Sequence, residues 1–480
     1  MSKDENRDKP GGATASGQSP DTQRLTIQQT LDLALREHTA GRLSKAEGMY
    51  RQILKAEPDN PVALHLLGVI AHQSGANDVA RDLIAKAIAL KPDYAEAHNN
   101  LGNVLLELGR LEDSVACCRE AIKLNPDYAE AHNNLGNAFH ELRRLDDAVA
   151  SYEKAIAIEQ DPEVYLNLGS AYQQLDRLDD AVATYEKALA LMPGFAEAHF
   201  NLGTALESQE KFESAIDNFE TAGTSAARLQ AMGCLYTLGR YDDLFQTIEK
   251  FAEVDKTDIN IASMSVFVSY QVDRENPHPF CKNPLDFIRV GSIGDSAQEI
   301  DDLTNEVMEQ LKDVPSMRKP RVAIMSGYQT ETDLFDDPKG GLARLERIVK
   351  AEIEDYYSEF KSKKCVYMDL WPAELHLKGW VVHLFKGGHQ DDHTHPVGWL
   401  SGVIYLKLPE TYEGDEGCIE FRLDGYDYPL LRDDGPTFRH RPEKGDIILF
   451  PASAIHRTIP LITDEQRTCL AFNLLPAPAG

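Results

Sequence analysis

The chain has 480 residues and is strongly acidic, with 49 basic against 78 acidic side chains and a formal net charge of −29. Such a charge repels the phosphates of nucleic acids and the anionic surfaces of membranes, so we expect neither as a partner. Seven scattered cysteines without a CxxC spacing indicate neither a zinc–thiolate site nor a disulfide framework.

Residues 1–24 are rich in Ser, Gly, Asp, Lys and Thr and lack the apolar core of a signal peptide. Nowhere does the chain contain an apolar run of about 18 residues, the length that a membrane-spanning helix needs. The sequence therefore predicts a cytoplasmic protein that begins with a disordered tail. We attribute the excess of acidic side chains to a well-solvated surface. The less favoured alternative is that they recognise a basic polypeptide substrate.

From about residue 25 the sequence repeats with a period of about 34 residues. Glycines mark the register and prolines mark the repeat ends: Gly68, Gly102, Gly136, Gly169 and Gly203, and Pro58, Pro92, Pro126 and Pro193. This spacing of Leu-Gly, Ala and Pro identifies residues 25–258 as a tetratricopeptide-repeat array of about seven units. In this family each unit is a pair of amphipathic helices, and the units stack into an all-α superhelix because none can bury its apolar face alone.

One asparagine recurs immediately before the Leu-Gly pair of four repeats: Asn100, Asn134, Asn167 and Asn201. In tetratricopeptide repeats this position lies on the first helix, which lines the concave surface. A side-chain amide both donates and accepts hydrogen bonds, so it can hold a peptide backbone without reading side chains. The ladder resembles that of repeat domains in protein glycosyltransferases and predicts a protein or peptide partner in the groove. The alternative is that the asparagines belong to the helix surface and bind nothing.

The periodicity stops after residue 258, and we predict a second domain over residues 259–480 with its core over 372–480. Apolar spacing predicts helices over 295–311 and 340–361. Runs of β-branched and aromatic residues predict strands over 380–385, 403–408, 445–450 and 468–475. His383 falls within the first of these strands, where we expect an ordinary strand residue.

The segment 387–406 carries a group of histidines that is typical of a metal site. His393 and His395 flank a single residue. In strand-like backbone, side chains two residues apart project to the same side, so both imidazoles could bind one ion. A third ligand must then come from elsewhere in the chain.

His456 is the candidate for that ligand, because the predicted strand 445–450 ends just before it. Arg467 opens the predicted strand 468–475, which we expect to be a neighbour in the same sheet. This arrangement would place a guanidinium near the metal, and a guanidinium fork suits a carboxylate.

Two groups of residues resemble the sequence strings of iron(II)- and 2-oxoglutarate-dependent oxygenases of the prolyl-hydroxylase-like group. The first comprises His393, Thr394, His395, Pro396, Trp399, Leu400, Ser401, Gly402, Val403, Tyr405, Leu406 and Pro409, and the second Gly445, Asp446, Phe450, Pro451, His456 and Arg467. The resemblance implies a double-stranded β-helix (jelly roll) with bracing helices. It also implies Fe(II) held by His393, His395 and His456, with 2-oxoglutarate paired to Arg467 and hydrogen-bonded by Tyr405.

The chain departs from this family at one point, because the usual HxD pattern is replaced by His393-Thr-His395. Either the site is all-histidine, or a carboxylate from Asp391 or Asp392 enters it. His389-Gln-Asp391 also spells HxD and ranks second. A polar loop cluster without any metal is the remaining alternative.

The combined features predict an enzyme, an Fe(II)- and 2-oxoglutarate-dependent dioxygenase that hydroxylates a polypeptide recruited by the repeat groove. Dioxygen and 2-oxoglutarate would be its co-substrates. Two alternatives stay open: a small-molecule hydroxylase, and a non-catalytic scaffold with a degenerate oxygenase fold. The presence of Arg467 favours an enzyme, because a scaffold does not need a residue that anchors a co-substrate.

Overall fold

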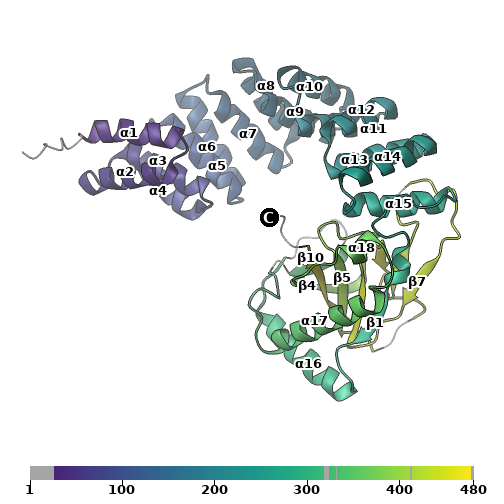
Figure 1. Ribbon diagram of the computed structural model, residues 1–480. Helices are drawn as coiled ribbons and strands as arrows, with labels where there is room; N and C mark the ends of the chain where they lie inside the picture. The colour runs from purple at the N-terminus through teal and green to yellow at the C-terminus, as the bar shows by residue number, and fades with distance from the viewer. Residues whose placement is uncertain (1–25, 318–323, 331, 411–412, 427, 477–480) are drawn as a thin grey trace, which may run out of the picture. The chain divides into compact units, whose positions relative to one another are not determined.

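The computed structural model describes residues 26–317, 324–330, 332–410, 413–426 and 428–476 (Figure 1). The predicted disordered tail, residues 1–24, lies outside these residues. The chain forms two compact units, residues 1–191 and 192–480. No helix within the described ranges is both long and apolar enough to cross a membrane.

The described part of the first unit consists of ten helices that pack in consecutive pairs. They are α1 (Ile27–Thr39), α2 (Leu43–Ala56), α3 (Pro61–Gln73), α4 (Asn77–Leu90), α5 (Ala95–Glu107), α6 (Leu111–Leu124), α7 (Ala129–Glu141), α8 (Leu145–Ile158), α9 (Pro162–Gln174) and α10 (Leu178–Leu191). Local sequence fixes where α3 begins. The Asn60 side chain accepts a hydrogen bond from the Ala63 amide, and Pro61 occupies the first helical position. Small residues such as Ala131 and Ala148, both 0% exposed, let the helices approach closely.

The second unit begins with five further helices: α11 (Ala196–Ser208), α12 (Phe212–Ala222), α13 (Ser225–Thr237), α14 (Tyr241–Val254) and α15 (Ile259–Gln271). The division by contacts thus falls before α11, whereas the boundary predicted from the repeat period lies between α14 and α15. A physical reason for the difference is that α13 and α15 contact a loop of the strand-rich part. The Tyr236 hydroxyl, for example, donates to the Pro429 carbonyl at 2.7 Å.

Within the described residues, the rest of this unit contains ten strands and a few helices. The helical elements are η1 (Pro284–Phe287), α16 (Ala297–Gln310), η2 (Leu311–Asp313), α17 (Gly340–Phe360) and α18 (Val366–Asp369). The strands are β1 (Arg289–Ser292), β2 (Ser316–Met317), β3 (Ile324–Thr330), β4 (His376–Gln390), β5 (Leu400–Lys407), β6 (Ile419–Arg422), β7 (Thr437–His440), β8 (Asp446–Pro451), β9 (His456–Thr458) and β10 (Arg467–Leu475).

These strands form two antiparallel sheets, a seven-stranded one in the order β1-β8-β5-β10-β4-β3-β2 and a three-stranded one in the order β7-β6-β9. An all-helical repeat array followed by a strand-rich domain of antiparallel sheets is the predicted architecture, and it is consistent with a jelly-roll oxygenase. The fold-class prediction is therefore confirmed.

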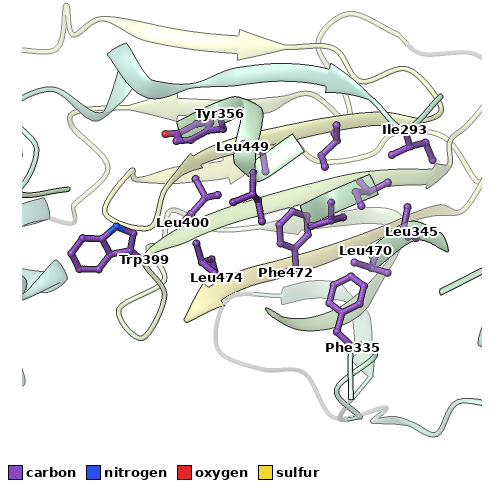
Figure 2. Packing of buried hydrophobic residues seen from close by; sticks show 14 of the residues in the cluster. Ile293, Phe335, Leu345, Tyr356, Trp399, Leu400, Leu449, Leu470, Phe472 and Leu474 are labelled. Carbon is purple, nitrogen blue, oxygen red and sulfur yellow. The ribbon is translucent and has the colours of Figure 1, made fainter. Parts of the chain in front are cut away.

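The side chains of the central strand β10 alternate between two apolar layers, one on each face of the sheet. Leu470, Phe472 and Leu474 lie in a cluster with residues of α16 and α17, such as Leu345 (Figure 2). Cys469 belongs to the cluster on the opposite face of the sheet. Because successive side chains of a strand point to opposite faces, the odd-numbered residues of β10 are the ones that face the candidate site.

Candidate metal centre

The segments carrying His393 and His456 are fixed to each other by their own backbone. The two residues form an isolated antiparallel bridge, in which each amide donates to the other carbonyl at 3.1 Å. The His395 amide donates to the Ala452 carbonyl at 3.0 Å, which anchors the third histidine to the end of β8. The three imidazoles are thus placed by main-chain hydrogen bonds between segments about 60 residues apart.

Their ring nitrogens converge on one point. One nitrogen from each of His393, His395 and His456 lies within 4.8 Å of the other two. The Nε2 atoms of His395 and His456 are 3.4 Å apart. Two imidazoles bound to one first-row ion at about 2.1 Å place their nitrogens about 3 Å apart, which is close to the separation of the His395 and His456 nitrogens.

Backbone carbonyls orient two of these rings. The Nδ1 of His393 lies 2.7 Å from the Asp391 carbonyl, and the Nδ1 of His456 lies 3.0 Å from the Ala454 carbonyl. A carbonyl only accepts, so in a neutral ring each Nδ1 carries the hydrogen and leaves the Nε2 lone pair for a metal.

Burial also keeps these ligands uncharged. It lowers the pKa of His395 to about 3, with the neighbouring His393 adding to the effect. It lowers the pKa of His456 well below its usual range and lowers that of His393 as well. Neutral imidazoles are the protonation state that binds metal, and burial therefore prepares the site at neutral pH.

The predicted alternative ligands lie outside this cluster. The carboxylate of Asp391 is 3.3 Å from Nε2 of His389 and is 60% exposed. The carboxylate of Asp392 is 3.7 Å from the Arg422 guanidinium, and burial raises its pKa. Among the described residues, the metal-competent group contains the three histidines and none of these side chains.

Arg467 lies at the start of β10 and is only 1% exposed. Its Nη1 donates to the Gly417 carbonyl at 2.9 Å, and its guanidinium lies 4.9 Å from the ring centre of Tyr405. Within the described ranges, its Nε has no hydrogen-bond partner. A buried donor without a partner is costly, and a bound carboxylate would satisfy it. The unpartnered Nε is therefore a donor suited to an anionic group.

Two adjoining pockets meet at the histidines. The inner pocket is lined by all three imidazoles together with Tyr405, Arg467 and Cys469. The outer pocket has a volume of about 300 Å³, and Lys378, Gln329 and Val397 contribute to its lining. Trp380, Gln390, His393 and His395 line both pockets.

Trp380 and Gln390 did not figure in the sequence analysis as site residues. A signal for Trp380 was available, because it opens a predicted strand and shares its face with the residues two and four positions later. Val382 and Leu384 do lie in the site-side apolar cluster, with Trp380 packed against it. Nothing in the local sequence indicated Gln390.

The predicted asparagine ladder takes part in hydrogen bonds between repeats. The Asn134 amide donates to the Asn99 side chain at 3.0 Å, and Asn134 is 7% exposed. Asn100 donates to His65 Nε2 at 2.8 Å, and Asn167 donates to the Asn133 side chain at 3.3 Å. Asn201 is half-buried on α11, in the other unit. The amides of Asn100, Asn134 and Asn167 therefore link neighbouring repeats, and the peptide-binding role of all four asparagines stays a prediction.

Comparison with known proteins follows the same two parts. Residues 378–473 match a family model described as "Putative 2OG-Fe(II) oxygenase". Tetratricopeptide-repeat models match residues 31–95, 85–109, 102–143, 136–176 and 160–222. A stretch of 67 residues is 33% identical to a PKHD-type hydroxylase from Burkholderia lata and covers 14% of this chain. It spans 24%, about a quarter, of that relative's length.

Two of the solved structures that are similar to part of the chain are the following. A thermophilic TPR protein of Thermus thermophilus is 28% identical, with a TM-score of 0.34, over 38% of this chain and 99% of its own. PilW, a type IV pilus biogenesis factor, is 22% identical, with a TM-score of 0.39, over 40% of this chain and 90% of its own.

The fold and the site define a protein in which a helical repeat array precedes an antiparallel-sheet domain with a three-histidine cluster. The chain combines tetratricopeptide repeats with a C-terminal domain of the 2OG-Fe(II) oxygenase family.

Proposed function

We propose that the C-terminal domain is an Fe(II)- and 2-oxoglutarate-dependent oxygenase that hydroxylates a polypeptide recruited by the repeats. The observation that carries this proposal is the shared inner pocket. Three imidazoles with ring nitrogens within 4.8 Å of one another line the same pocket as Arg467, a guanidinium that is only 1% exposed. A metal next to a buried cation is the arrangement required to bind a 2-oxo dicarboxylate at both ends.

His393, His395 and His456 would hold Fe(II), each through the nitrogen that faces the cluster. When bound, iron and 2-oxoglutarate supply the activation of dioxygen, with 2-oxoglutarate converted to succinate and carbon dioxide. Arg467 would donate to the far carboxylate of 2-oxoglutarate. Tyr405 packs its ring against the Arg467 guanidinium and so restricts the orientation of the donors.

The outer pocket would admit the substrate. Its volume of about 300 Å³ is at the lower end for ligand sites, which suits a single side chain better than a large small molecule. Trp380 and Gln390 line both pockets and would lie between substrate and metal. The repeats support a polypeptide substrate, because a stacked array provides the extended concave surface that holds one.

A non-catalytic scaffold is less well supported. A scaffold gains nothing from a buried guanidinium whose Nε lacks a partner within the described residues, because such a donor destabilises the fold unless a ligand satisfies it.

The proposal is tested by anaerobic Fe(II) titration of the metal-free full chain, followed by a succinate-release assay with 2-oxoglutarate. We expect one Fe(II) per chain. The variant His456→Ala should weaken iron binding by more than about 100-fold and abolish succinate release, since two imidazoles rarely hold a divalent ion. His440→Ala is the matched control, because His440 bonds Asp446 at 2.7 Å and lies outside the cluster. Unchanged iron content in His456→Ala would remove the proposed ligand set.

A further inference from the structure

The loop after β6 is held by helices that lie far from it in the sequence. We call its described residues, 423–426 and 428–435, the clasp. The side chain of Gln271, at the end of α15, is 2% exposed. Its Oε1 accepts from the amides of Leu431 at 2.7 Å and Arg432 at 2.9 Å, and its Nε2 donates to the Arg432 carbonyl at 3.0 Å. One buried amide therefore satisfies three main-chain groups of the clasp.

Two tyrosines of α13 and α15 extend this contact. The Tyr236 hydroxyl donates to the Pro429 carbonyl at 2.7 Å, and the Tyr270 hydroxyl donates to the Asp434 carboxylate at 2.8 Å. Together with Gln271, these side chains hold the clasp at three places along its length.

Aromatic packing between the same helices and the clasp fills the space behind these hydrogen bonds. Phe267 of α15 lies with its ring centre 5.2 Å from that of Tyr426, whose burial raises its pKa to about 12. Tyr428 reaches Gly233 of α13 so closely that a Cβ there would lie 2.6 Å from the tyrosine Cζ. Any side chain at position 233 would force the Tyr428 ring to move, so glycine here permits the close approach of the clasp.

The other end of the clasp packs against residues that adjoin two of the candidate ligands in the sequence. A Cβ at Gly425 would overlap Ile455 and would lie 3.0 Å from Oδ1 of Asp392. Arg422, the last residue of β6, donates its amide to the Ile455 carbonyl at 3.2 Å and places its guanidinium 3.7 Å from Asp392. Asp392 and Ile455 directly precede His393 and His456 in the sequence. The start of the clasp thus packs against the neighbours of two candidate ligands.

Strand β6 continues this contact. It pairs with β9 in a register that places Phe421 opposite His456, and the two rings are 5.6 Å apart at an interplanar angle of 29°. A displacement of β6 would therefore move the surface on which the His456 ring rests.

We propose that the clasp couples α13 and α15 to the metal centre and that Gln271 is a positioning residue for His393 and His456. Without the three hydrogen bonds of Gln271, two amides and a carbonyl would lose their partners and the loop would regain conformational freedom. Gly425 and β6 would then no longer be held against the ligand segments. The metal part of this inference rests on the proposed function, whereas the mechanical part concerns residues of the chain alone.

The mechanical part is tested by hydrogen–deuterium exchange of the full chain without metal. Gln271→Met keeps the volume of the side chain and removes its hydrogen bonds. We expect exchange about fivefold faster in peptides covering both the clasp and residues 455–458. Ser225→Ala is the matched control, because Ser225 links α13 to Asp258 and Asn260 near the start of α15 without touching the clasp. It should leave residues 455–458 unchanged.

Two results would overturn the proposal. Unchanged exchange in the clasp would show that Gln271 does not hold it. Faster exchange in the clasp with unchanged exchange at residues 455–458 would show that the clasp does not position β9.

A second measurement follows the metal site through the visible absorption of Co(II), which reports ligand geometry. Gln271→Met should bind Co(II) about tenfold more weakly with an altered spectrum, while Ser225→Ala should match the wild type. An unaltered affinity and spectrum in Gln271→Met would reject its positioning role. Failure of the wild type to bind Co(II) would reject the proposed function instead, and the exchange experiment would still decide the role of the clasp.

Discussion

Arg467 is 1% exposed, and among the described residues its Nε has no hydrogen-bond partner. At the scale of single residues this makes it the most informative side chain of the inner pocket. Its position near the candidate ligands was predicted from the sequence, because it opens an apolar strand that was expected to neighbour theirs. Its burial and the missing partner of its Nε could not be predicted, since they depend on Gly417 and Tyr405, which lie far away in the chain.

Arg467→Ala should keep the metal and lose the co-substrate. We expect 2-oxoglutarate affinity to fall by about 2–5 kcal/mol, the cost of truncating one side of a desolvated charge pair. Arg467→Lys should give an intermediate loss, because it keeps the charge but not the planar fork. The measurement is anaerobic calorimetric titration of the Fe(II)-loaded chain with 2-oxoglutarate. Equal 2-oxoglutarate affinity in the wild type and Arg467→Ala would contradict this role.

His65 makes the stability of the repeat array depend on pH. Burial lowers its pKa from 6.5 to about 4. Between these values the unfolded chain takes up a proton that the folded chain refuses, so the free energy of unfolding should decrease as the pH falls from 6.5 towards 4. The decrease attributable to this group amounts to roughly 3 kcal/mol at most. Urea unfolding at pH 7 and pH 5 measures it. His65→Gln should flatten the dependence, and an unaltered slope in this variant would exclude His65 as its source.

At the scale of elements, local periodicity predicted most of the framework. The helices expected over 295–311 and 340–361 are α16 and α17, and the strand expected over 468–475 is β10, with bounds within about two residues. These elements could be predicted because amphipathic spacing is a property of neighbouring residues. The pairing of β6 with β9 could not, because register between distant strands depends on contacts that only the fold brings together.

The backbone around His393 illustrates the same limit. We expected strand-like backbone to place two imidazoles on one side, but His393 forms only an isolated bridge and His395 precedes a turn. The imidazoles converge nonetheless, because the main chains of His393 and His395 are both hydrogen-bonded to residues that follow β8. The two imidazoles are grouped as predicted, but hydrogen bonds to the region after β8 group them, rather than strand geometry.

Leu470 tests the alternation along β10. It is 0% exposed and lies in the apolar layer beside α17, away from the site. Leu470→Ala should destabilise the chain by about 2–5 kcal/mol while leaving Fe(II) affinity unchanged at low temperature. Urea unfolding and metal titration measure the two quantities. Cys469→Ala is the comparison from the site face, with a smaller expected loss of stability. A folded Leu470→Ala chain with weakened metal binding would contradict the two-layer description.

At the scale of the whole molecule, the asparagine ladder decides whether the repeats deliver a substrate. Replacing Asn100, Asn134, Asn167 and Asn201 together by Ala should weaken capture of an extended chain severely while leaving 2-oxoglutarate turnover without substrate intact. Each amide contributes only about 0.5–1.5 kcal/mol, so the effect must accumulate along the ladder. A reduced and alkylated unfolded protein serves as the probe, and a pull-down read by mass spectrometry extends the test to cellular partners.

The control replaces Asn99 and Asn133, which accept hydrogen bonds from Asn134 and Asn167. That variant loses these two bonds between repeats but keeps all four ladder amides. Equal loss of capture in both variants would assign the ladder to stabilisation of the array. An unchanged set of captured proteins in the quadruple variant would remove the ladder from substrate recruitment.

The two-part organisation could be predicted because a repeat and a motif are both patterns of residues close together in the sequence. The contacts between the helices and the strand-rich part of the second unit could not be predicted in this way. The three hydrogen bonds of Gln271 join residues about 160 positions apart, and a glutamine at a helix end carries no signal of such a contact in the sequence.

The fit between Gly233 and Tyr428 also determines where the protein can be cut for laboratory work. A fragment starting at residue 259 would lose Tyr236 and Gly233 and so leave the rings of Phe267, Tyr426 and Tyr428 uncovered. Exposed aromatic patches of this kind promote aggregation. A fragment starting at residue 192 keeps all of these partners together. Recombinant production of the oxygenase part should therefore retain α11 to α15, and poor solubility of a shorter fragment would reflect the missing helices rather than a defective iron site.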